Sequence, residues 1–174
     1  MNARLRFVWM ALLAIFLGLS GPLPAEPVAD DIWLVSTRGL PYFCCGGSDV
    51  SGATYWRLGP VRQWIAADQA SFLATGRPTT PTCIVIHGNR SRQNDAVAEG
   101  YQLLSILQCQ TPQQPLRLVI WSWPADPIAA RARQDAQVKA SRSDGQSCYL
   151  AQLLGRMNPQ IPVSMIGYSF GARI

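Results

Sequence analysis

The sequence has few of the residues from which metal centres are built. His87 is the only histidine, and none of the five cysteines belongs to a C-x-x-C pair. Structural zinc sites need Cys and His ligands at short, regular spacings. This sparse set argues against zinc or any other bound metal.

Charged residues are also scarce, at 14% of the 174 residues, whereas 48% are apolar. That composition is typical of one packed globular domain rather than of a disordered chain. Basic residues exceed acidic ones 15 to 10, and 14 of the 15 are arginines scattered singly along the chain. Because nucleic-acid-binding surfaces cluster their basic residues, we expect no nucleic acid partner and interpret the excess as a mildly basic surface.

A long apolar run occurs only near the N-terminus. Two arginines precede Phe7–Ser20, a stretch of 14 strongly apolar residues, and small residues follow up to Ala25. This order is that of an export signal over residues 1–25, and the run is short for a bilayer-spanning helix. We expect a periplasmic or extracellular protein with its domain over residues 27–174 and no stable membrane anchor after cleavage. An uncleaved anchor is the alternative, since the next charge is Glu26.

The cysteines can form disulfides in an exported chain, but their odd number leaves at least one unpaired. They are Cys44, Cys45, Cys83, Cys109 and Cys148. The neighbours Cys44 and Cys45 cannot easily pair with each other. We therefore expect one disulfide from this segment to another cysteine, whose identity stays open.

Two strands and a helix are predicted at the start of the domain. Asp31–Arg38 and Ala53–Leu58 are rich in β-formers and are separated by a Cys-Gly-rich stretch, which predicts an antiparallel pair. A helix is expected next, ending at Gly76 and Pro78. Its apolar residues recur at helical spacing and are Val61, Trp64, Ile65, Phe72 and Leu73.

Apolar strands and helices then alternate. Continuous apolar runs, which are typical of strands buried on both faces, occur in three segments: Thr82–Asn89, Leu116–Pro124 and Pro162–Ser169. A helix is expected between the first two, with Asn94 as its N-cap. One interrupted helix or two successive helices are expected over Ile128–Met157. The alternation predicts an α/β fold with a mostly parallel sheet and helices on both faces.

The long helical segment carries a second start signal. Ser143 and Gln146 fit a capping box for its second half. The inward face of that half is predicted to be Leu150, Leu153, Leu154 and Met157.

Functional residues are expected at the carboxyl ends of the parallel strands. The last strand runs into Gly167-Tyr168-Ser169-Phe170-Gly171, a G-x-S-x-G motif. A serine nucleophile is held clear of a sheet by a sharp strand-to-helix turn. Small residues at Gly167 and Gly171 let the strand and the helix pass closely. The motif therefore predicts Ser169 as a nucleophile.

An acyl-transfer site also needs N–H groups directed at the developing oxyanion. The backbone N–H of Phe170, immediately after the serine, is one predicted donor. The other is the backbone N–H of Asn89, in the loop after His87 and Gly88. Gly88 lets the backbone turn there without a side chain that blocks the substrate.

The stretch from about Thr82 to Ile174 resembles the front half of an α/β-hydrolase. V-I-H-G-N, V-I-W-S-W-P-A-D and M-I-G-Y-S-F-G-A-R stand in the order and spacing of that superfamily, and the S-W-P step is similar to a group of bacterial esterase/lipase-like members. The resemblance implies a serine hydrolase that acts on a small-molecule ester or related acyl substrate and needs no cofactor. It also implies a structural role for His87. Esterase, lipase, amidase and thioesterase activities all stay open.

The sequence departs from that superfamily after the serine. In α/β-hydrolases the triad acid and histidine follow the nucleophile, but neither occurs among the five residues after Ser169. We therefore expect a fragment that holds the N-terminal half of the domain. A sheet that ends at the strand before Ser169 leaves that strand as an exposed apolar edge, so the 174-residue chain is expected to be marginally stable and prone to aggregation. It is also expected to be nearly inactive, since an unassisted serine is a weak nucleophile. An exported binding module that has lost catalysis is the alternative.

Other residues near the strand ends have ordinary interpretations. We interpret Asp126 as a loop-capping carboxylate, with an orienting role in the site as the alternative. Arg90 and Arg92 are interpreted as solvent-facing, with attraction of an anionic substrate as the alternative. Trp121 and Trp123 are expected to belong to the core or a pocket wall.

Overall fold

A computed structural model describes residues 31–44, 49–112, 114–128 and 132–174. The predicted export signal over residues 1–25 lies outside the described residues. Within these ranges, no helix is both long enough and apolar enough to cross a membrane.

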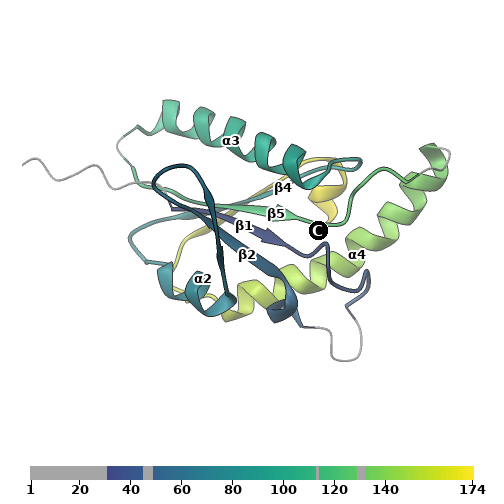
Figure 1. Ribbon diagram of the computed structural model, residues 1–174, viewed down its shortest axis with the longest axis horizontal. Helices are drawn as coiled ribbons and strands as arrows, with labels where there is room; N and C mark the ends of the chain where they lie inside the picture. Colours follow the sequence, from purple (N-terminus) through teal and green to yellow (C-terminus); the bar gives the residue numbers. More distant parts are fainter. Residues whose placement is uncertain (1–30, 45–48, 113, 129–131) are drawn as a thin grey trace, which may run out of the picture.

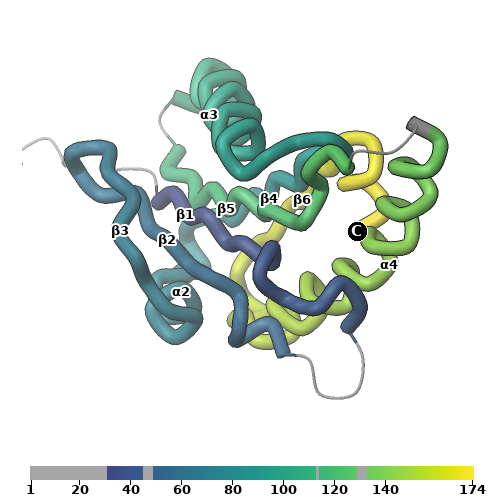
Figure 2. The backbone as a smooth tube through the Cα atoms, turned by 45° about the vertical axis from the view of Figure 1, so that its right-hand side comes forward, coloured from purple at the N-terminus to yellow at the C-terminus, as the bar shows by residue number. Residues whose placement is uncertain are grey.

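A six-stranded sheet forms the centre of the described structure (Figure 1), and its strands lie in the order β3-β2-β1-β5-β4-β6 (Figure 2). The parallel strands are β1 (Asp31–Ser36), β5 (Arg117–Ser122), β4 (Thr82–Ile86) and β6 (Val163–Gly167). An antiparallel hairpin of β2 (Thr54–Leu58) and β3 (Trp64–Ala67) extends the sheet beside β1. The predicted α/β class, with a mostly parallel sheet, is confirmed, and so is the antiparallel pairing of the first two strands.

Helices cover both faces of this sheet (Figure 2). Helix α3 (Gln93–Gln110) lies on one face, and α2 (Gln69–Thr75) and α4 (Ala132–Arg156) lie on the other. Successive residues of a strand point to opposite faces, so Leu34 packs in the layer of α3 and Trp33 in the layer of α2 and α4. This double cover explains why β4 and β5 are buried along their whole length.

The helix predicted from Val61 is wrong in its first half, where the chain forms β3. A turn at Gly59 and Pro60 causes the difference. The Gly59 N–H donates to the Gln63 carbonyl over 2.8 Å, and Arg62 adopts a φ of 58°. This tight turn sends the chain back along β2, and strand pairing then outweighs the short helical period.

Helix α3 begins at Gln93, so Asn94, the predicted N-cap, is wrong by two residues. Its N-cap is Arg92, whose backbone N–H donates to the carboxylate of Asp95 over 2.7 Å. Asn94 therefore lies inside the first turn. An acidic side chain in that turn performs the capping that the pattern assigned to an amide.

Helix α4 runs without a break through Ser143 and Gln146, so the predicted capping box is wrong. Both side chains are fully buried, and Gln146 accepts a hydrogen bond from the Thr37 hydroxyl at the end of β1. Tertiary contacts thus explain these two polar residues. The predicted inward face is confirmed, since its members are buried or packed against the core: Leu150, Leu153, Leu154 and Met157.

Strand β6 is exposed along its whole length, so the prediction of a third buried strand is wrong. It lies at the edge of the sheet and, within the described ranges, pairs with β4 alone. Met165 is 56% exposed and Ile166 is 40% exposed. Strand β6 is therefore an exposed apolar edge of the sheet, and such edges are templates for pairing with another strand.

One disulfide joins Cys44, after β1, to Cys148 in α4, across 104 residues. The predicted bond from the first cysteine pair is confirmed, with Cys148 as its partner. Cys83 is a buried free thiol and Cys109 an exposed one. Cys45 lies outside the described residues.

Candidate active site

Ser169 occupies a strained turn between β6 and the 3-10 helix η2 (Ser169–Arg173). Its φ is 53°, in the left-handed region. A non-glycine residue held in that region costs about 1–3 kcal/mol, and such residues cluster at functional sites. Ser169 is exposed to solvent. The turn therefore presents a serine at the carboxyl end of the parallel strands.

The two glycines of the motif each have a steric reason. A Cβ added to Gly171 would lie 2.3 Å from the carbonyl oxygen of Ile86, and one added to Gly167 would lie 2.7 Å from the Cα of Ala172. Both contacts are with backbone, which cannot swing aside as a side chain can. Close packing of the turn on β4 and on itself therefore requires glycine at both positions.

The loop after β4 lies against the Ser169 turn. The Tyr168 N–H donates to the Ile86 carbonyl over 3.1 Å. A Cβ added to Gly88 would lie 2.8 Å from the ring of Tyr168. Asn89 and Phe170, the predicted oxyanion donors, therefore belong to two segments in direct contact. Phe170 also packs its partly buried side chain against the core.

His87 is buried, and both of its ring nitrogens are engaged. Nδ1 lies 2.9 Å from the Gly88 carbonyl oxygen, and Nε2 lies 3.2 Å from the Trp123 backbone nitrogen. Because a carbonyl can only accept, Nδ1 carries the proton and Nε2 accepts from the Trp123 N–H. The rings of His87 and Trp123 stack with their centroids 5.7 Å apart. These contacts tie the loop after β4 to the end of β5.

The charge state of His87 follows from its surroundings. Burial lowers the pKa of His87 to about 4, and the hydrogen bond to the Gly88 carbonyl only partly opposes this. The imidazole is therefore neutral near pH 7. Since its Nε2 lone pair already accepts from Trp123, His87 is not arranged to take a proton from Ser169.

Asn89 is anchored through its side chain. Its Nδ2 donates to an Asp135 carboxylate oxygen over 3.0 Å, and its Oδ1 accepts from the Arg90 N–H over 2.8 Å. Asp135 is itself buried in α4 and lies 3.7 Å from the buried Lys139 ammonium. Burial raises the pKa of Asp135, but hydrogen bonds from Ile128 and Asn89 and the charge of Lys139 together lower it by more, so the net shift is downward. A charged carboxylate therefore fixes the side chain of Asn89.

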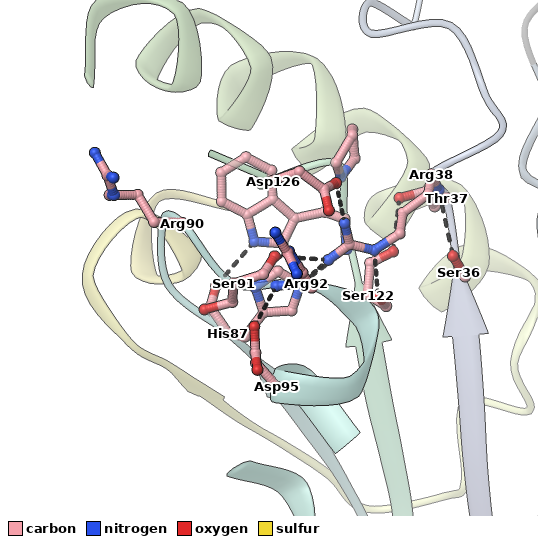
Figure 3. A network of polar contacts seen from close by, with 12 residues as sticks. Ser36, Thr37, Arg38, His87, Arg90, Ser91, Arg92, Asp95, Ser122 and Asp126 are labelled. Carbon is pink, nitrogen blue, oxygen red and sulfur yellow. Dashed lines mark hydrogen bonds and ion pairs between the residues drawn. The ribbon is translucent and has the colours of Figure 1, made fainter. Parts of the chain in front are cut away.

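Arg38, two residues after the end of β1, occupies the middle of a polar network at this end of the sheet (Figure 3). Its Nε donates to the Ser122 hydroxyl over 2.7 Å, and its Nη1 forms an ion pair with the Asp126 carboxylate. Its Nη2 donates to the Ser91 carbonyl over 2.9 Å and lies 3.4 Å from Nε2 of His87. The side chain is only 16% exposed. Burial lowers the pKa of Arg38, although Asp126 opposes the shift.

The remaining predicted neighbours divide between surface and core. Arg90 and Arg92 are exposed, and Trp121 and Trp123 are fully buried, as interpreted from the sequence. Asp126 is bound to Arg38 rather than to a candidate catalytic group. Across the described part of the chain, no three His, Cys, Asp or Glu side chains gather as a metal site would need.

Three residues of this site were missed from the sequence: Arg38, Asp135 and Lys139. Arg38 had a usable signal, since it is the last residue of the predicted strand Asp31–Arg38, at the end where functional residues gather. Asp135 and Lys139 had none. An acid and a base four residues apart in a polar helix resemble a solvated ion pair, and only tertiary packing buries them.

Comparison with protein-family models, curated proteins and solved structures gave no match. The resemblance to α/β-hydrolases therefore stays a prediction. The geometry itself brings together an exposed serine on a strained turn and a backbone loop fixed by a neutral imidazole, a guanidinium and a carboxylate. Such an arrangement suits covalent chemistry at the serine hydroxyl.

Proposed function

We propose that the protein is a serine hydrolase that cleaves a carboxyl ester or related acyl bond, with Ser169 as the nucleophile. The φ of 53° at Ser169, between two glycines that admit no Cβ, carries this proposal. A nucleophile elbow combines these features at the end of a parallel strand. A serine that serves only the fold has no need of a strained turn between two such glycines.

The oxyanion hole in this proposal consists of the backbone N–H groups of Phe170 and Asn89. Contact between the Ser169 turn and the loop after β4, through Gly88 and Tyr168, supports the pairing of these two donors. When Ser169 Oγ bonds to the acyl carbon, the carbonyl oxygen becomes an anion that both N–H groups can stabilise. One such donor contributes about 10²–10³-fold to the rate in serine hydrolases.

The proton of Ser169 also has to be removed during attack. The sequence has one histidine, and the Nε2 of that residue, His87, accepts from Trp123. General base catalysis contributes about 10²–10⁴-fold. We therefore propose that an ester acylates Ser169 of this chain slowly and without a cofactor. A base added from solution speeds this step.

The test is acylation by p-nitrophenyl acetate at increasing imidazole concentration, with the direct reaction of imidazole subtracted. Imidazole takes the Ser169 proton, the acetyl group transfers to Oγ, and p-nitrophenolate leaves. The expected result is faster release with the wild-type chain than with Ser169→Ala, together with an acetyl group on the peptide that contains Ser169. Ser164→Ala, which removes an exposed serine of β6, is the matched control and should behave as wild type. Equal release by wild type and Ser169→Ala would remove this serine from the mechanism.

An exported binding module of α/β-hydrolase type without catalysis is the second candidate function. The engagement of both His87 nitrogens favours it, because the only imidazole of the sequence is committed to structure. A fluorophosphonate probe added together with imidazole separates the two functions, since it reacts with activated serines and imidazole supplies the base that this chain lacks. Failure of both the probe and the ester to modify Ser169 would favour the binding module.

A further inference from the structure

One guanidinium anchors both ends of the loop that follows β4. Nη2 of Arg38 donates to the Ser91 carbonyl over 2.9 Å and approaches Nε2 of His87 to 3.4 Å. Gly88 and Asn89 lie between these two contacts in the chain. The side chains drawn in Figure 3 show Arg38 reaching across from β1 to this loop.

The loop needs such an anchor because its backbone is strained. Arg90 has a φ of 62°, which a non-glycine residue rarely adopts. A strained conformation persists only when its surroundings hold it. Asn89 supplies one constraint, through its bonds to Asp135 and to the Arg90 N–H. Arg38 supplies the next one along the chain, at the Ser91 carbonyl.

The other half of the guanidinium is fixed to β5. Nε donates to the Ser122 hydroxyl, and Nη1 pairs with Asp126. A guanidinium presents five donors in a rigid plane, so it can hold the end of β5 and the loop after β4 at a set distance. A lysine ammonium offers the same charge but cannot span both sides with a fixed fork.

We propose that Arg38 is a positioning residue, which holds residues 87–91 so that the Asn89 N–H is directed at the oxyanion. Arg38 acts through the loop and does not touch the substrate. The effect on acylation rests on the proposed function. The anchoring of the loop is a separate property that can be measured without it.

The experiment compares the wild-type chain with Arg38→Gln, Arg38→Lys and the control Arg57→Gln. Arg57 also pairs with an aspartate, Asp31, over 2.7 Å, but it lies on β2 and is 51% exposed. The first readout is the imidazole-dependent acylation of Ser169. Arg38→Gln should slow it about 10- to 100-fold, as expected for a misplaced oxyanion donor, and Arg57→Gln should leave it unchanged. Arg38→Lys should be more stable than Arg38→Gln, because it keeps the positive charge, but its Ser169 should be acylated as slowly.

The second readout does not require activity. The single histidine gives one set of ¹⁵N ring signals, and the Nε2 shift reports on the hydrogen bonds that it accepts. Arg38→Gln should move this shift at pH 7 and speed hydrogen exchange of the Arg90 amide, whose N–H donates to Asn89 Oδ1, by about tenfold or more, since loss of an anchor favours local opening. Arg57→Gln should change neither.

The outcomes separate the two proposals. If no chain is acylated, the proposed function fails, and the His87 and Arg90 signals alone decide the positioning role. If Arg38→Gln matches Arg57→Gln in ring shift, amide exchange and acylation, the positioning role is wrong. If Arg38→Lys restores the acylation rate in full, the charge of Arg38 matters and its fork does not, which also overturns the inference.

Discussion

Arg38 and Arg117 lie at opposite ends of the same parallel strands and are both largely removed from solvent. Arg117, at the amino end of β5, is 1% exposed, and its guanidinium carbon lies 4.1 Å from the ring centroid of Phe72. Nη2 donates to the Phe72 carbonyl and to the Thr75 hydroxyl, and Nε lies 3.3 Å from an Asp31 oxygen. Burial lowers the pKa of Arg117 to about 10. Arg38, at the carboxyl end, is instead surrounded by polar groups of loops and strand ends.

The partners of the two arginines indicate what each end of the sheet does. Arg117 binds the last turns of α2 and an aromatic ring of the core, so it holds secondary structure elements together. Arg38 contacts Ser122 at the end of β5, Asp126 after it and two residues in the loop after β4, so it holds the loops of the candidate site. This agrees with the general rule that ligands bind at the carboxyl ends of parallel strands.

Of the substitutions that test this difference between the two ends of the sheet, Arg117→Ala should lower the free energy of unfolding most. The substitution leaves Asp31, which is 15% exposed, without its buried partner, and it frees a carbonyl of α2. Removing one member of a buried pair costs about 3–5 kcal/mol, whereas a more exposed pair costs less. Urea unfolding should therefore show a larger loss for Arg117→Ala than for Arg38→Gln. A smaller or equal loss would contradict the division between a structural end and a functional end.

Low pH should lower the free energy of unfolding through His87, which lies at the carboxyl end of the parallel strands. The pKa is about 4 in the folded chain, and an unfolded histidine has a pKa of about 6.5. Between these values the unfolded state binds more protons, so the free energy of unfolding falls as the pH drops from about 6.5 to about 4. The loss from this one group is about 3 kcal/mol.

The matched variant for that measurement is His87→Gln, which removes the titrating group. Unfolding free energies at pH 7 and pH 4.5 should differ less in the variant than in the wild-type chain. Identical pH dependence in both chains would show that the imidazole is not buried in its neutral form.

A pair of glycines gives the smallest and most local test. Gly171→Ala places a methyl group against the Ile86 carbonyl, and overpacking of this kind costs about 1–3 kcal/mol. Gly155, inside α4, has no atom within 4 Å of an added Cβ, so Gly155→Ala should stabilise the chain by about 0.5–1 kcal/mol. Opposite shifts in melting temperature are expected. Equal shifts would mean that the Ser169 turn is not packed against β4.

Local signals predicted the central strands and the Ser169 turn well. Helices cover β4 and β5 on both faces, so nearly every side chain of these strands is buried and their sequences are continuous apolar runs. Gly167 and Gly171 are fixed by backbone contacts within and beside the turn, which is why a short motif could identify it. β3 was mistaken for a helix because Trp64 and Ile65 fit either period, and the turn at Gly59 and Pro60 decides between them.

Residues whose role depends on distant partners could not be predicted in this way. The apolar run of β6 suggested burial, but the strand lies at an edge, and edge position is a property of the whole sheet. Gln146 matched a helix cap although its partner is Thr37, more than a hundred residues away in the chain. The Arg38 network joins three strand ends that are adjacent only after folding.

The bond between Cys44 and Cys148 has a consequence for limited proteolysis. It closes a covalent ring that contains β2, β3, α2, β4, α3 and β5, together with most of α4. A protease that cuts once within this ring, for example at the exposed turn around Val61, leaves both pieces linked. The nicked chain therefore migrates as one species until a reductant is added, and only then do two fragments separate.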